Sequence, residues 1–206
     1  MKNMKTKAEN PADLLEGRGA SALIQAYLEL CQLKLLYRQG WLRRGVSPEL
    51  CESVAEHSFG VALLTLWLAQ ACFPQLDADK ALRMALLHDF GEIYAGDLIP
   101  SDRVAAEEKH TLEAESVERV LGKLPGGEEY LRLWQEFEAG DSAEARLVRQ
   151  VDRLEMGLQA GAYQLLGQGG LEQFFLSARQ ALEEAQLVSL LDEMQALAGQ
   201  KDADIT

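Results

Sequence analysis

The sequence has few cysteines, prolines and histidines, and it lacks long apolar runs. Its three cysteines, Cys31, Cys51 and Cys72, are odd in number and widely spaced, with no Cys-x-x-Cys pair. This pattern argues against a disulfide framework and against a thiolate zinc site. No run reaches the roughly 18 apolar residues that a membrane span needs. The amino terminus begins with lysines but has no apolar block behind them, so it is not a secretion signal. A cytoplasmic protein without membrane contact is therefore expected.

Positive charge is also scarce. Lysine and arginine together number 20 against 33 aspartates and glutamates, which gives a formal net charge of −13. A field of that sign repels a polyphosphate backbone, so a nucleic-acid polymer is not an expected partner. A small phosphate ester remains compatible with this charge if the site carries its own cation.

The chain is rich in Ala, Leu, Glu, Gln and Arg, which favour helix over sheet. Apolar residues recur at helical spacing, and no strand-like alternation is present. The sequence predicts an all-α fold, a single helical bundle of six to seven helices over residues 19–197. A flexible leader over 1–18 and a tail over 198–206 flank it. Helices are expected at about 20–38, 52–73, 78–95, 103–123, 128–139, 142–167 and 171–197.

Several polar side chains occupy positions that should face the apolar interior. His57 lies on the apolar stripe of its helix, His88 follows Met-Ala-Leu-Leu and is joined directly to Asp89, and Asp152 shares the apolar face of its helix. A buried carboxylate without a partner is costly, and a bound cation or hydrogen bonds reduce that cost. Three predicted helices therefore direct metal-binding groups toward one interior.

Two imidazoles and two carboxylates suit one divalent transition metal ion, namely Mn, Co, Fe, Ni or Zn, with Mg as a further candidate. Four protein ligands on a six-coordinate ion leave positions for water and for a substrate oxygen. An ion of this kind lowers the pKa of its bound water and so provides a hydroxide nucleophile at neutral pH.

Each residue taken alone has a simpler interpretation. His57 could be a core histidine with one hydrogen bond, Asp89 could pair with Arg83, and Asp152 could pair with Arg149 or Arg153. The spacing of the whole set favours a metal site over these alternatives.

Five collinear segments resemble the HD-domain phosphohydrolases, named for their His-Asp pair, and most closely their 5'-deoxyribonucleotidase branch. The segments are Glu52-Ser-Val-Ala-Glu-His57-Ser, Leu87-His88-Asp89-Phe-Gly-Glu92-Ile-Tyr-Ala-Gly96-Asp97, Pro100-Ser-Asp102, Glu108-Lys-His110 and Ser142-Ala-Glu-Ala-Arg-Leu-Val-Arg-Gln-Val-Asp152. The resemblance implies metal ligands at His57, His88, Asp89 and Asp152. It also implies a small phosphate ester as substrate, in particular a deoxynucleoside 5'-monophosphate, and a homodimer.

The resemblance further implies a catalytic carboxylate at Glu92, a second active-site acid at Asp97 and a phosphate-binding arginine at Arg38. Glu92 follows His88 by four residues and Asp89 by three, so it is expected to project over the same face of the helix, where it could orient a water molecule. Asp97 could protonate the leaving 5' oxygen or hold the sugar. Arg38 has a guanidinium fork suited to a phosphate dianion.

Alternatives remain for each of these residues. Glu92 could be an exposed partner of a lysine, Asp97 a turn residue, and Arg43 or Arg44 could replace Arg38. His110 is expected on a solvated face. The family often has an aromatic residue directly after its arginine, whereas here Gln39 and Gly40 precede Trp41.

For the whole chain, the alternative functions are another HD-type phosphomonoesterase or phosphodiesterase and a non-catalytic, metal-stabilised helical scaffold.

Overall fold

The computed structural model describes residues 4–15 and 18–200, which form two compact units. Unit 1 comprises the chain up to Phe59 together with Leu86–Glu138, and unit 2 comprises Gly60–Ala85 and the chain from Ala139 onward. The predicted all-α fold is confirmed, because β structure in the described residues is limited to two isolated antiparallel bridges, Thr6 with Leu36 and Tyr37 with Ser53. No helix in these residues is long and apolar enough to cross a membrane.

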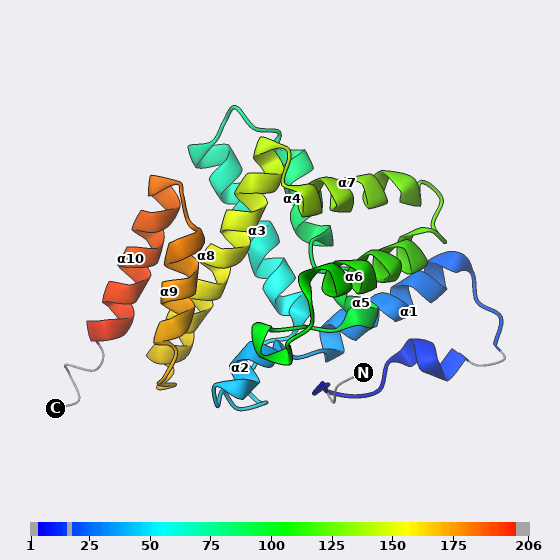
Figure 1. Cartoon of the computed structure of the whole chain (residues 1–206), viewed down its shortest axis with the longest axis horizontal. Coiled ribbons are helices and arrows are strands. Elements are labelled where there is room, and N and C mark those ends of the chain that lie inside the picture. The colour runs from blue at the N-terminus through cyan, green and yellow to red at the C-terminus, as the bar shows by residue number, and fades with distance from the viewer. Residues whose placement is uncertain (1–3, 16–17, 201–206) are drawn as a thin grey trace. The chain divides into compact units, whose positions relative to one another are not determined.

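The helices follow one another with short connections, as the ribbon shows (Figure 1). In chain order they are the 3-10 helix η1 (Pro11–Leu15), α1 (Ala22–Leu35), α2 (Gln39–Arg43), α3 (Val54–Cys72), α4 (Ala78–Leu87), α5 (Glu92–Ala95), the 3-10 helix η2 (Pro100–Asp102), α6 (Ala106–Leu121), α7 (Gly127–Ala139), α8 (Ala143–Leu165), α9 (Glu172–Ala181) and α10 (Ala185–Gln200).

Two predicted helices are each divided in two. The third predicted helix separates into α4 and α5 at residues 88–91, and the last one separates into α9 and α10. At the second break Leu182 is extended, and the side-chain oxygen of Gln150 accepts hydrogen bonds from Glu183 N at 2.7 Å and Glu184 N at 3.0 Å. A side chain on α8 thus satisfies backbone donors that the break leaves outside the helix.

The amino-terminal segment of unit 1 is hydrogen-bonded to the end of α1, where the sequence predicted a flexible leader. Lys7 N donates to Leu35 O at 2.7 Å, and Asn10 is buried and caps Ala12. The pairing uses backbone groups, which leave no periodic pattern in the sequence. Residues 1–3, 16 and 17 of the predicted leader, and 201–206 of the predicted tail, lie outside the described residues, while 198–200 belong to α10.

The core of unit 1 joins α1 and α6 to the start of α3 and to α5. Its buried members include Leu33, Leu36, Val54, Ile93 and Val120. Because Val54 and Ile93 stand beside the histidine of α3 and the acids around α5, this core fixes the elements that carry the site.

Unit 2 is built chiefly by α8, α9 and α10, which lie side by side (Figure 1). Gly157 and Gly161 of α8 allow close approach: a Cβ on Gly157 would lie 2.4 Å from Leu191 Cδ1, and one on Gly161 would lie 2.6 Å from Met194 Cγ. Two glycines four residues apart therefore form a smooth stripe against which α10 packs.

Candidate active site

His57 is positioned by the first turn of α3. Ser53 and Glu56 form a reciprocal cap, in which Ser53 N donates to Glu56 Oε2 at 2.7 Å and Glu56 N donates to Ser53 Oγ at 3.3 Å. This is the capping-box pattern, in which each side chain satisfies an orphan backbone donor of the other residue. The cap fixes the start of the helix, and His57 follows one residue later with a side chain that is 1% exposed.

His88 and Asp89 lie in a turn between α4 and α5, where the sequence predicted continuous helix. Phe90 N bonds to Leu87 O and Glu92 N to Asp89 O, both at 3.0 Å, so the chain tightens to bonds that span three residues. The break coincides with close packing at Gly91, where a Cβ would lie only 2.5 Å from Glu113 Cβ and 3.0 Å from Glu113 Cα.

The structure brings His57, His88 and Asp89 together. One ligand atom from each lies within 4.8 Å of the others, and all three side chains are buried or nearly so. Asp89 Oδ2 lies 3.7 Å from His57 Nε2 and 3.2 Å from His88 Nε2.

These residues fit a divalent metal ion. Asp89 Oδ2 is buried and accepts no hydrogen bond from any described residue. Leaving a carboxylate oxygen in that state is expensive, whereas a cation between two imidazoles would compensate it. The donor set, nitrogen and oxygen without thiolate, suits the transition metals that the sequence indicated.

Asp152, the fourth predicted ligand, lies on α8 in unit 2, and Arg153 Nε stands 3.6 Å from its Oδ2. This contact matches the ion pair that the sequence left open as an alternative. A metal role for Asp152 stays a prediction.

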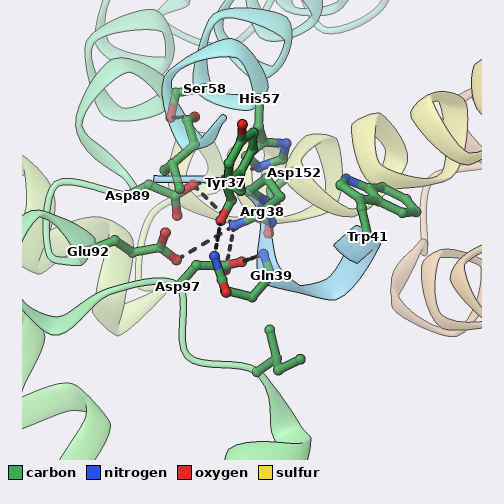
Figure 2. Close-up of polar contacts among 12 residues, drawn as sticks. Tyr37, Arg38, Gln39, Trp41, His57, Ser58, Asp89, Glu92, Asp97 and Asp152 are labelled. Carbon is green, nitrogen blue, oxygen red and sulfur yellow. Dashed lines mark hydrogen bonds and ion pairs between the residues drawn. The ribbon is translucent and has the colours of Figure 1, made fainter. Parts of the chain in front are cut away.

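Arg38 lies among three carboxylates, as Figure 2 shows. Its Nη1 is 3.0 Å from Asp97 Oδ1, 3.6 Å from Glu92 Oε1 and 3.7 Å from Asp89 Oδ2. Its rival Arg43 instead binds Asp102 at 2.6 Å and Ser101. The structure therefore brings Arg38, and not Arg43, to Glu92 and Asp97.

Asp97 is buried and both its oxygens are used. Oδ1 accepts from Arg38, and Oδ2 accepts from the backbone N–H of Gln39. Gly96 precedes it with φ +80, and a Cβ there would meet Met4 Sδ at 2.1 Å. The sequence missed Gln39, whose role depends on a backbone N–H and leaves no residue-type signal.

The side chain of Gln39 is bound to the amino-terminal segment. Its Nε2 donates to Lys5 O at 3.0 Å, and its Oε1 accepts from Lys5 N at 3.0 Å. Trp41 is also buried, and its indole donates to Glu52 Oε1 at 2.7 Å. Neither side chain therefore stands free to stack on a substrate in this conformation.

The acids of the site differ in their proton affinities. Burial acts to raise the pKa of Asp89, but the adjacent His88 and Arg38 outweigh it and hold that pKa well below its ordinary value. Burial raises the pKa of Glu92 well above its ordinary value, and the negative charges of Asp89 and Asp97 add to this. Two carboxyls three residues apart thus have opposite tendencies, an arrangement found where acids take different catalytic roles.

Comparison with known proteins agrees with this geometry. A family model described as HD domain matches residues 30–187. The chain belongs to the HD-domain family. This HD-domain protein is 36% identical over 191 residues to "5'-deoxynucleotidase HDDC2" of Bos taurus, covering 91% of each chain. It is 33% identical over 158 residues to "5'-deoxynucleotidase YGK1" of Saccharomyces cerevisiae, covering 72% of this chain and 71% of that one.

Among solved structures, the PH0347 protein from Pyrococcus horikoshii OT3 is 35% identical to this chain. The match has a TM-score of 0.69 and covers 86% of this chain and 98% of that one. The family predicted from the sequence is thereby confirmed.

Proposed function

We propose that this protein is a metal-dependent 5'-nucleotidase that hydrolyses deoxynucleoside 5'-monophosphates to nucleoside and phosphate. The observation that carries the proposal is the buried group of His57, His88 and Asp89 directly beside Arg38 and Glu92. A group of metal-binding side chains next to a guanidinium and a buried carboxyl suits phosphoryl transfer, which requires mainly positioning and charge stabilisation. The names of the curated relatives support the same substrate class.

His57, His88, Asp89 and, by proposal, Asp152 would hold one divalent ion. When bound, such an ion supplies Lewis-acid polarisation of a phosphate oxygen and a water molecule of lowered pKa. Activity measured with each metal in turn identifies which transition metal the protein uses and whether Mg can replace it.

The protein's own residues bind, orient and accept protons around that centre. Arg38 would contact the phosphate through its guanidinium. Glu92 Oε2 is buried and accepts no hydrogen bond from the described residues, so a water molecule could donate to it and be oriented for attack. Both carboxylate oxygens of Asp97 accept hydrogen bonds, one from Arg38 and one from Gln39 N, which supports a role in holding Arg38 in position.

The test is phosphate release from a panel of deoxy- and ribonucleoside 5'-monophosphates, with the protein loaded in turn with Mn, Co, Fe, Ni, Zn and Mg. We expect turnover with at least one metal, and faster turnover on deoxyribonucleotides. Absence of release from every substrate with every metal would overturn the proposal.

A non-catalytic, metal-stabilised scaffold is the second candidate. It is favoured by one observation only, the burial of the metal-binding group. Thermal melting with and without chelator separates the candidates when it is combined with the assay, since a scaffold loses stability on chelation and never turns over substrate. The homodimer and the cytoplasmic location stay predictions, and sedimentation of the purified protein tests the first of them.

A further inference from the structure

The Glu-Lys-His motif of α6 contributes two side chains that serve different neighbours. The ring of His110 stacks on Trp134 with centroids 5.9 Å apart and an interplanar angle of 11°, and its Nδ1 lies 3.3 Å from Glu138 Oε2. His110 is therefore part of the packing of α6 on α7. Lys109, the cationic member of the motif, has a different environment.

The face of α6 that carries Lys109 one turn before Glu113 packs against the turn between α4 and α5. Ser116 Oγ accepts from Tyr94 N at 3.1 Å and donates to Phe90 O at 3.4 Å. The backbone of Gly91 approaches Glu113 so closely that any side chain would collide with it. These contacts fix α6 beside Asp89 and Glu92.

Lys109 is paired with Glu113, the residue of α6 that packs on Gly91 of that turn. Its Nζ lies 3.4 Å from Glu113 Oε1, and its side chain is 40% exposed, whereas that of Glu113 is 12% exposed. Burial lowers the pKa of Lys109, but Glu113 and Glu92 outweigh this and raise it above its ordinary value, with a smaller contribution from Asp89. The ammonium is thus held in its charged form, oriented by Glu113, and open to solvent.

The site needs such a cation. Arg38 Nη1 already has carboxylate oxygens of Asp89, Glu92 and Asp97 within 4.0 Å. Fully ionised, the three acids and the guanidinium sum to −2, so one bound divalent ion would cancel this charge and leave no positive surplus to attract a phosphate dianion. A second cationic side chain, from the face of α6 that packs on this turn, would supply that positive charge.

We propose that Lys109 is a second phosphate-binding residue of this site, held in position by Glu113 and acting with Arg38 on the substrate's phosphate dianion. The proposal rests on the proposed function for its substrate class, and it assigns a role to a residue that the metal site and Glu92 leave unused. Lysine serves in such a position as a point charge that donates up to three hydrogen bonds.

The test compares Lys109→Gln with Lys34→Gln. Lys34→Gln is a matched control, because it removes the same charge from an exposed position of unit 1. The one hydrogen bond described for Lys34 Nζ is to Tyr27 OH, at 3.3 Å. Binding of inorganic phosphate to the Mn-loaded protein is measured by calorimetry, and KM and kcat are measured on the best 5'-monophosphate. We expect Lys109→Gln to weaken phosphate binding and raise KM by about tenfold, and Lys34→Gln to change each by less than about twofold.

Lys109→Arg keeps the charge and should recover phosphate binding to within about threefold of the wild type. The proposal would be overturned if Lys109→Gln bound phosphate as tightly as the wild type, or if its kcat fell while KM and phosphate affinity stayed the same. Failure of the wild-type protein to bind phosphate would also overturn it. If phosphate binding depends on Lys109 but no nucleotide is hydrolysed, the proposed function fails and the phosphate site stands.

Discussion

The two units of the chain bury different kinds of residue. Unit 1 buries several ionisable groups, including His57 and Glu92. Among the described residues of unit 2 one carboxylate is buried, Glu155, and the helices pack through glycines and aliphatic side chains such as Gly157 and Leu191. Burial of a charge lowers stability unless it is paired, while burial of an apolar side chain adds to stability. Unit 1 therefore buries several groups that lower stability unless they are paired or bind an ion, whereas unit 2 is stabilised mainly by apolar packing.

The largest effect is expected at the centre of unit 1. Asp89→Asn removes the carboxylate between the two imidazoles, so metal content should fall to background and kcat/KM by on the order of 1,000-fold. Elemental analysis and the nucleotidase assay measure both. The matched control is Asp192→Asn in unit 2, an exposed residue 3.9 Å from Arg179 Nε, which should change neither. Equal metal content in the two variants would contradict the assignment.

The next variant tests whether unit 2 contributes chemistry at all. If Asp152 supplies the fourth ligand, Asp152→Asn should weaken metal binding and lower kcat/KM by about 100-fold, with an unchanged far-ultraviolet spectrum. Titration of the metal-free protein with Mn measures the affinity. Full activity and affinity would assign Asp152 to its ion pair with Arg153, and the two units would then differ completely in role.

Gly91 and Gly157 give a direct comparison of close packing in the two units. Gly91→Ala forces a Cβ against the Cβ and Cα of Glu113, atoms that no side-chain rotation can move away. We expect a loss of about 3 kcal/mol of stability. Since the turn carries Asp89 and Glu92, we also expect a fall of about tenfold in kcat/KM. Gly157→Ala meets the end of the Leu191 side chain, which can rotate, and the Cβ of Ala178 at the looser distance of 3.1 Å, so it should cost about 1–2 kcal/mol with unchanged kcat/KM.

Chemical denaturation and steady-state kinetics of both variants decide the matter. An unaffected kcat/KM in Gly91→Ala would show that the turn tolerates displacement, and the contrast between the units would weaken.

A feature of the fold or the site could be predicted from the sequence where it depends on residue type and spacing, and not where it depends on contacts between distant segments. The helical class, the family and the candidate residues are carried by residue type and spacing, and the structure brings His57, His88 and Asp89 together as expected. The break between α4 and α5 could not be predicted, because it accompanies the approach of Gly91 to Glu113, a residue 22 positions later (113 − 91).

Contacts made by the backbone were equally invisible. Gln39 donates to Asp97 through its backbone N–H, and Lys5 and Lys7 pair with Tyr37 and Leu35 through backbone groups, which every residue except proline possesses in full. The choice of Arg38 over Arg43 likewise depends on where the two guanidinium groups lie in space, since both fit the same charge pattern.

The smallest expected effect concerns Glu113, whose ionisation links α6 to the turn. Burial raises the pKa of Glu113 to about 7, with Glu138 and Asp89 adding to the rise and Lys109 opposing it. A carboxyl whose pKa is higher in the folded than in the unfolded protein binds more protons when folded, so stability falls as the pH rises from about 4.5 to about 7. Glu113→Gln removes that titration, and the metal-free variant should show a shallower decline, by on the order of 1 kcal/mol across this range. Urea denaturation at pH 5 and pH 7.5 measures the slope. Equal slopes in wild type and variant would mean that burial of Glu113 does not lower the free energy of unfolding. The cost of burying ionisable groups in unit 1 would then lie in the residues around Asp89.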